Sequence, residues 1–103
     1  MTGLTVEGGD WSYALLRGQD LSGFDLRRLR LREADLSEAD LTDADLRGAD
    51  LTRARLNNAT LSGADLRETL VDGVDLSAAR VAHARLDLAG AVQLAWSLGA
   101  VVD

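Results

Sequence analysis

Aspartate recurs at five-residue intervals over much of this 103-residue chain, and this carboxylate column is the first feature that could do chemistry. Each of eight aspartates stands directly before the aliphatic centre of a five-residue unit: Asp20, Asp25, Asp35, Asp40, Asp45, Asp50, Asp65 and Asp75. Regularly spaced carboxylates could bind cations or form an acidic surface. A short acceptor side chain beside a bend can instead accept hydrogen bonds from nearby backbone N–H groups. We favour this turn chemistry and expect no metal site, because the glycine-rich nonapeptides of calcium-binding β-rolls are absent.

One segment is more acidic than the rest of the chain. Six carboxylates with no basic residue among them form what we call the acidic patch: Glu33, Asp35, Glu38, Asp40, Asp43 and Asp45. Four arginines precede it: Arg27, Arg28, Arg30 and Arg32. The whole chain has a formal net charge of −6, so we expect no direct nucleic-acid binding. The acidic patch would suit a basic protein partner, and a merely solvated acidic face is the alternative.

The chain lacks the residues from which most catalytic sites are built. It has no cysteine and a single histidine, His83, which we expect at an outward-facing corner. Nucleophilic and acid–base catalysis need a reactive group beside a positioned partner. An interior filled by leucine and alanine would also leave no pocket for a substrate. We therefore expect a protein that is not an enzyme and uses no cofactor and no small-molecule substrate.

A five-residue repeat over residues 14–88 must position these polar groups. Fifteen aliphatic residues mark its centres: Leu16, Leu21, Leu26, Leu31, Leu36, Leu41, Leu46, Leu51, Leu56, Leu61, Leu66, Val71, Leu76, Val81 and Leu86. Leucines five apart scatter around an α-helix and alternate between the two faces of a flat strand, so neither structure buries them together. A short extended piece followed by a bend does bury them. Ala34 and Leu36 then point inward, Asp35 points outward, and residues 37–38 form the bend.

The segment ADLSEADLTDADLRGADLTRARLNNATLSGADL resembles the pentapeptide-repeat proteins, whose signature is A-(D/N)-L-x-x. The resemblance implies an all-β solenoid, a right-handed quadrilateral β-helix in which four pentapeptides form one coil. Fifteen repeats then make about four coils, stacked roughly 4.8 Å apart. We expect a single domain over residues 1–103, with regular repeats in 14–88. Residues 4–13 would be degenerate repeats that cap the N-terminal end, where Trp11 plugs the core.

Four-fold winding would stack residues that are twenty positions apart. One side would then align three aspartates with three arginines: Asp25, Asp45, Asp65, Arg27, Arg47 and Arg67. Columns of like charge repel, so we expect aspartate and arginine to pair across this side. Exposed pairs contribute only ~0–1 kcal/mol each, which makes a solvated salt-bridge lattice the expected result.

The repeat stops before the C-terminus, where the sequence reads LAGAVQLAWSLGAVVD. Asp87 is a suitable N-cap for a helix over residues 88–98, and Gly99 suits its end. Only Gln93 and Ser97 form a polar stripe on this helix. A helix that is apolar nearly all round is buried on more than one side, and one side can cover the open end of the solenoid.

We expect Leu88, Val92 and Ala95 to pack this helix against the last coil. The other side would join two copies into a homodimer through four residues: Leu94, Trp96, Leu98 and Val101. The tail LDLAGAVQLAWSLGAVVD is similar to the C-terminal helix of bacterial quinolone-resistance pentapeptide proteins, and this similarity implies such pairing. A helix that only caps the solenoid is the alternative.

Two hypotheses for function follow. The first is a non-catalytic structural or protein-interaction module that dimerises through the helix and tail in residues 88–103. The second, implied by the resemblance, is a DNA mimic that binds and protects a type II topoisomerase such as gyrase. Residues 14–88 carry 14 acids and 11 arginines, whereas B-DNA carries about 11 charges over ~18 Å, so charge favours the first hypothesis. Without a signal-peptide pattern or an apolar run of membrane-spanning length, we expect a cytoplasmic protein that does not contact membranes.

Overall fold

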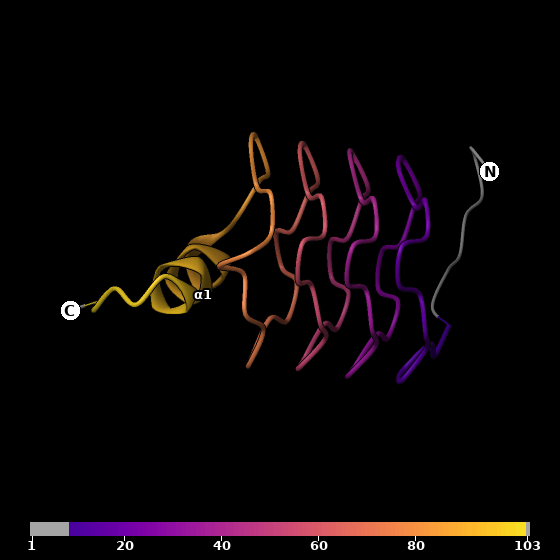
Figure 1. Ribbon diagram of the computed structural model, residues 1–103, viewed down its shortest axis with the longest axis horizontal. Helices are drawn as coiled ribbons and strands as arrows, with labels where there is room; N and C mark the ends of the chain where they lie inside the picture. The colour runs from indigo at the N-terminus through magenta and orange to yellow at the C-terminus, as the bar shows by residue number, and fades with distance from the viewer. Residues whose placement is uncertain (1–8, 103) are drawn as a thin grey trace.

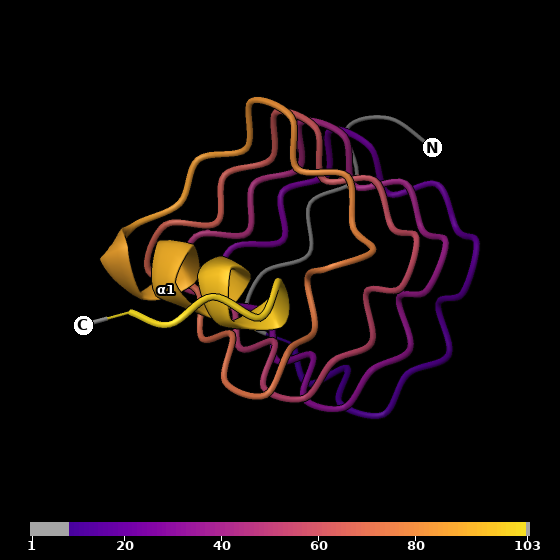
Figure 2. The same ribbon diagram turned by 60° about the vertical axis from the view of Figure 1, so that its left-hand side comes forward.

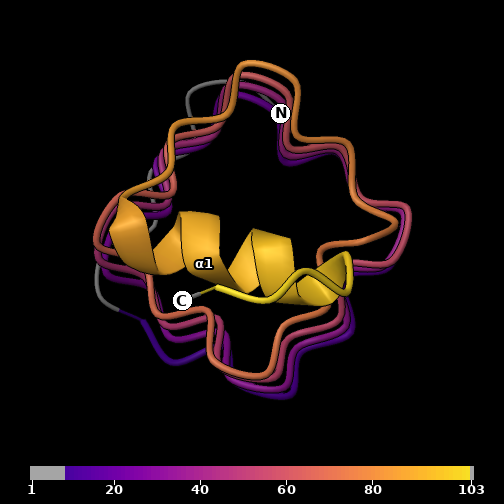
Figure 3. The ribbon, with the colours of Figure 1, turned by 90° about the vertical axis from the view of Figure 1, so that its left-hand side faces the viewer.

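The structure is a computed structural model that describes residues 9–102, and its main body is a coil of short extended segments. Every bridge between segments in this range is parallel and joins residues twenty apart, as Asp25 joins Asp45 and Asp45 joins Asp65. One coil is therefore four pentapeptides, and the stretch from Asp10 to Asp87 makes just under four coils (Figure 1). Seen along its axis, the coil has four sides (Figure 3).

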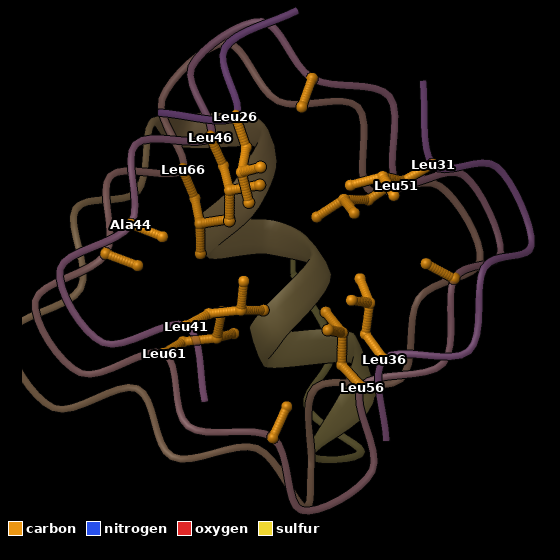
Figure 4. Close-up of a cluster of buried hydrophobic side chains, with 14 of the residues drawn as sticks. Leu26, Leu31, Leu36, Leu41, Ala44, Leu46, Leu51, Leu56, Leu61 and Leu66 are labelled. Atoms are coloured by element: carbon orange, nitrogen blue, oxygen red, sulfur yellow. The ribbon is translucent and has the colours of Figure 1, made fainter. Parts of the chain in front are cut away.

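We number the four sides by the residues that point inward from them. Side 1 carries Leu16, Leu36, Leu56 and Leu76, and side 2 carries Leu21, Leu41, Leu61 and Val81. Side 3 carries Leu26, Leu46, Leu66 and Leu86, and side 4 carries Trp11, Leu31, Leu51 and Val71. Figure 4 shows leucines of successive coils stacked over one another on all four sides.

The interior is closed between the second and third coils. Leu36, Leu46 and Leu61 are 0% exposed, and so are alanines such as Ala44 two residues before a centre. The expected inward positions are thus confirmed. Full burial of one leucine contributes roughly 1.5–3 kcal/mol, so the leucine columns are a major source of stability.

The pentapeptides centred on residues 11 to 71 and on Val81 bend at the second residue after the centre, where φ is positive. Five of these bends use glycine, such as Gly63 with φ 71°, and nine use other residues, such as Glu38 with φ 61°. The Ala39 N–H donates to the Leu36 carbonyl at 3.0 Å, which closes the bend in the manner of a type II turn. A residue with a Cβ costs about 1–2 kcal/mol in this conformation. A bond to the next coil, here from Glu38 N–H to the Asn57 carbonyl at 2.8 Å, offsets that cost.

The aspartate column supports these bends. Asp35 Oδ1 accepts a hydrogen bond from the Ser37 N–H at 3.0 Å, two residues further on. Eight more aspartates make the same contact: Asp10, Asp20, Asp25, Asp40, Asp45, Asp50, Asp65 and Asp75. The predicted turn chemistry is confirmed. No group of three or more acidic, histidine or cysteine side chains that could hold a metal ion lies within residues 9–102.

Helix α1, Leu88–Ser97, follows the last coil and lies across its end (Figures 1 and 2). It begins at the predicted N-cap, Asp87, and stops before Gly99, whose φ is 82°. The predicted helix is confirmed with an end one residue earlier. No helix in the described part of the chain has both the length and the apolar character needed to cross a membrane.

Side 1 of the last coil departs from the regular pattern. The side has bridges from Leu15 to Asp35 and from Asp35 to Arg55, but within residues 9–102 there is none from Arg55 to Asp75. Ala78 also lacks the positive φ of its equivalent, Asn58, one coil earlier. The repeat geometry therefore breaks down where the coil meets α1.

Candidate interaction surface at the C-terminal end

Polar side chains of α1 bond to the exposed backbone edge of the last coil. Gln93 Nε2 donates to the Val74 carbonyl at 2.8 Å, and the Ser97 hydroxyl accepts from the Leu76 N–H at 2.9 Å. The same hydroxyl lies 2.8 Å from the Gln93 carbonyl, which can accept its proton. The narrow polar stripe of the helix therefore faces the solenoid.

These contacts replace a missing coil. In the second coil the equivalent backbone groups, the Ala34 carbonyl and the Leu36 N–H, bond to Arg55 of the next coil at 2.9 and 2.8 Å. Within residues 9–102 the last coil has no such neighbour, so the Gln93 side chain supplies the donor to the Val74 carbonyl and the Ser97 side chain supplies the acceptor for the Leu76 N–H. A buried backbone group left without a partner costs about 1–3 kcal/mol, which is the reason for this arrangement.

Asp87 joins the start of α1 to the coil below. Its Oδ1 accepts from the Gly90 N–H at 3.1 Å, and its Oδ2 accepts from the Glu68 N–H at 2.7 Å. These backbone donors, Gly90 first, hold the pKa of the Asp87 carboxyl below its usual range. One carboxylate thus both caps the helix and anchors it.

The expected division of α1 into two apolar sides needs correction at two residues. Leu88, which we expected against the coil, is 80% exposed. Leu94, which we expected at a dimer interface, packs against the hydrophobic core instead. The prediction considered apolar residues alone. The helix is turned by the need to pair backbone groups of the coil, which brings Gln93 and Ser97 inward and moves Leu88 outward.

The remaining residues of the expected interface are accessible. Trp96 is 57% exposed, Leu98 65% and Val101 85%. Val92 and Ala95, expected on the coil side, are half-buried. The outer surface of α1 therefore remains largely apolar.

A groove of about 410 Å³ runs between α1 and side 4 of the last coil. The segment 69–72 forms one wall, and α1 forms the other with five residues: Leu88, Ala89, Val92, Gln93 and Trp96. Leu70 stands here in the outward position that Asp50 occupies one coil earlier, and it is 53% exposed. We call Leu70, Leu88, Val92 and Trp96 the apolar groove. In the sequence, this site is marked by Leu70, a leucine at a position where the repeat usually has aspartate.

Trp11 takes its place in the inward column of side 4. Its backbone N–H donates to the Arg30 carbonyl at 2.7 Å, and its side chain packs partly buried against the core. Residues 4–8 of the expected N-terminal cap lie outside the described residues, so the plug remains a prediction.

The acidic patch is divided among several sides of the solenoid. Asp35, Asp40 and Asp45 point outward from sides 1, 2 and 3, and the other three acids stand at bends: Glu33, Glu38 and Asp43. Glu38 pairs with Arg17 at 3.2 Å, and Asp45 pairs with Arg47 at 2.7 Å. Binding of a basic partner to this patch stays a prediction.

Side 3 carries the predicted salt-bridge lattice, with the strongest pairs inside a pentapeptide. Three arginines each hold the aspartate two residues before them through both Nε and Nη2: Arg27, Arg47 and Arg67. Pairs between coils are longer, at 3.8 Å from Arg27 to Asp45 and 3.7 Å from Arg47 to Asp65. The hydrogen bonds from Arg27 and Arg67 lower the pKa of Asp25 and of Asp65 to about 2.

A family model described as pentapeptide repeats matches this chain in eight copies, over residues 12–48 and 34–73. HetL, a pentapeptide repeat protein involved in heterocyst differentiation regulation in the cyanobacterium Nostoc sp. strain PCC 7120, is 34% identical with a TM-score of 0.73. The alignment covers 77% of this chain and 38% of HetL. A second Nostoc protein, alr5209, is 26% identical with a TM-score of 0.75, over 81% of this chain and 84% of the other. No curated protein matches this chain.

The chain therefore belongs to the pentapeptide-repeat family, and its fold is the right-handed β-helix solenoid of that family. It spans only 38% of the length of HetL. The plasmid-mediated fluoroquinolone resistance protein QnrB1 aligns at 20% identity with a TM-score of 0.31.

Proposed function

We propose that this protein is a non-catalytic interaction module that forms a homodimer through the outer surface of α1. The apolar groove carries the proposal, since Leu88 is 80% exposed and Trp96 is 57% exposed beside it. Contiguous exposed apolar surface is typical of a protein–protein contact. Tryptophan is enriched among the residues that dominate binding energy, so Trp96 is the expected anchor.

The contact must reach beyond the helix. A helix of ten residues is about 15 Å long, whereas a stable interface buries roughly 800 Å² on each partner. Leu70 on the coil and Leu98 and Val101 after the helix extend the apolar surface to both sides of α1. Across a two-fold axis every contact occurs twice, so each residue of this small surface contributes to the interface from both subunits.

Light scattering on the purified chain tests the dimer. The variant Leu88→Glu with Trp96→Glu should remain folded and run as a monomer, with its dissociation constant raised by at least about tenfold. Leu15→Glu is the matched control, because Leu15 is an equally exposed leucine, at 85%, on the first coil. A wild-type monomer at high concentration, or equal dissociation by the control, would contradict the proposal.

A topoisomerase partner is the second candidate. It is favoured by the outward column on side 2, where Asp20 lies beside Asp40 and neither makes an ion pair within residues 9–102. The paired arginines of side 3 weigh against a DNA-like surface there. A DNA supercoiling assay with gyrase decides: inhibition or protection by this protein would support the candidate, and no effect at a large excess would dismiss it. We also propose that the protein is cytoplasmic, as expected from the sequence.

A further inference from the structure

The end of the solenoid is only half covered. Helix α1 lies over sides 4 and 1, and the opposite bend of the last coil stays uncovered (Figure 3). On sides 2 and 3 of this coil, three N–H groups have no hydrogen-bond partner among residues 9–102: those of Val81, His83 and Leu86. The carbonyl groups of Ala79 and Ala84 likewise accept no bond in this range.

The equivalent groups of the preceding coil show which partners these groups would bind. There the N–H groups of Leu61, Gly63 and Leu66 donate to the last coil at 2.7, 2.9 and 2.8 Å. The Ala59 and Ala64 carbonyls accept from it at 3.0 and 2.8 Å. The last coil therefore offers a complete edge for one more parallel strand, which would bring two N–H groups and three carbonyls.

The side chains of this edge select for negative charge. Arg80 and Arg85 stand in the outward positions of sides 2 and 3, where Asp40 and Asp45 stand two coils earlier. Both arginines and His83 between them are exposed, and within residues 9–102 neither arginine has an ion pair. This local positive charge lies on a chain of net charge −6. It complements an acidic strand.

The inward side of the edge selects for apolar residues. Val81 and Ala84 are half-buried, whereas their equivalents one coil earlier, Leu61 and Ala64, are 0% exposed. Leu86 is half-buried as well, with Gly90 of α1 lying against it. An added strand with apolar residues inward and acids outward would complete their burial.

We propose that sides 2 and 3 of the last coil bind an acidic extended segment of a partner protein, added as a parallel strand. This edge is separate from the apolar groove, so the inference goes beyond the proposed dimer. The segment recognised would alternate apolar and acidic residues over about eight positions, as the repeats of this chain do.

A capped synthetic peptide, Ala-Asp-Leu-Thr-Asp-Ala-Asp-Leu, provides the probe. Its sequence is that of residues 39–46, which occupy sides 2 and 3 of an inner coil. Fluorescence anisotropy on the full chain should show binding, and Arg80→Glu with Arg85→Glu should weaken it by about tenfold. A peptide with arginine at its second and seventh positions should recover that loss on the double variant. Arg28→Glu with Arg53→Glu, at exposed arginines on other corners, should leave binding unchanged.

Backbone pairing is tested separately. Methylation of the peptide nitrogens at its second and seventh residues removes the donors to the Ala79 and Ala84 carbonyls and should abolish binding. Equal binding by the methylated peptide, or by the Arg80/Arg85 variant, would overturn the proposal. Tighter binding of a DNA duplex than of the peptide would assign the edge to nucleic acid instead. Leu88→Glu with Trp96→Glu should keep peptide binding, so failure of the dimer does not decide this test.

Discussion

The inner coils and the last coil differ in the groups that pair with their backbone and cover their inward side chains. In the inner coils, backbone bonds backbone at every side, and leucines such as Leu46 are 0% exposed. In the last coil, side chains of α1 bond Val74 and Leu76, and Val81 and Leu86 are only half-buried. Solenoid stability is a sum of neighbour contacts, so a coil with one neighbour depends on its cap. The last coil should therefore be the least stable part of the repeat.

The two halves of that end differ in the same way. In the half over sides 4 and 1, α1 bonds the Val74 carbonyl and the Leu76 N–H, and its outer surface is apolar and exposed. The half over sides 2 and 3 has open backbone groups and exposed arginines. One end thus presents two chemically distinct surfaces, which is why we assign them different partners.

A charge placed inside the inner coils should destabilise the fold most. Leu46→Asp should unfold the chain, because burying an unpaired carboxylate costs several kcal/mol in addition to the lost leucine packing. Leu86→Asp, at the equivalent position of the half-open coil, should lower the melting temperature but leave the other coils folded. Circular dichroism during heating measures both. Equal melting temperatures for the two variants would contradict the proposed difference in stability between the inner coils and the last coil.

A smaller effect is expected from the cap. Ser97→Ala leaves the Leu76 N–H without its acceptor and should lower the free energy of unfolding by about 1–3 kcal/mol. Ser62→Ala, at a half-buried serine of an inner coil whose hydroxyl makes no hydrogen bond within residues 9–102, should change it by less than about 0.5 kcal/mol. Urea titration of both variants gives the comparison. If Ser97→Ala were neutral, α1 would not act as a substitute coil.

The smallest effect concerns the salt-bridge lattice and depends on pH. The pKa of Asp65 is about 2 in the fold, below its ordinary value of 3.8, because the Arg67 side chain donates hydrogen bonds to it, so this pairing stabilises the fold fully above about pH 4. That stabilisation is lost as the pH falls toward 2. Arg67→Met should raise this pKa and move acid unfolding to higher pH, with a change of only ~0–1 kcal/mol at neutral pH.

The control for this acid titration is Arg53→Met, since Arg53 has no ion pair within residues 9–102. Its acid midpoint should match that of the parent chain. An unchanged midpoint for Arg67→Met as well would mean that the guanidinium does not hold Asp65 ionised.

Inside the repeat, local patterns alone predicted the structure. The five-residue period placed Leu46 inward, Asp45 outward and the bend two residues after the centre, because each unit repeats the same bonds to its neighbours. The turn role of aspartate could be predicted because the carboxylate and the N–H group that it accepts from lie within three residues of each other. At α1 the same kind of reasoning failed for Leu88 and Leu94, because the orientation of a helix with apolar residues nearly all round is not determined by its own pattern.

The sequence was enough to predict the repeat, the turn role of aspartate and the bounds of the helix to within one residue. Its family resemblance implied the four-sided winding. Each of these depends on residues close together in the chain or on the strict period. Three features could be seen only in the folded chain: the face of α1 that meets the coil, the position of the apolar groove and the half of the end that stays open. Those features arise where Gln93 and Ser97 meet backbone groups some twenty residues earlier, and the pairing of those groups outweighs the burial of Leu88.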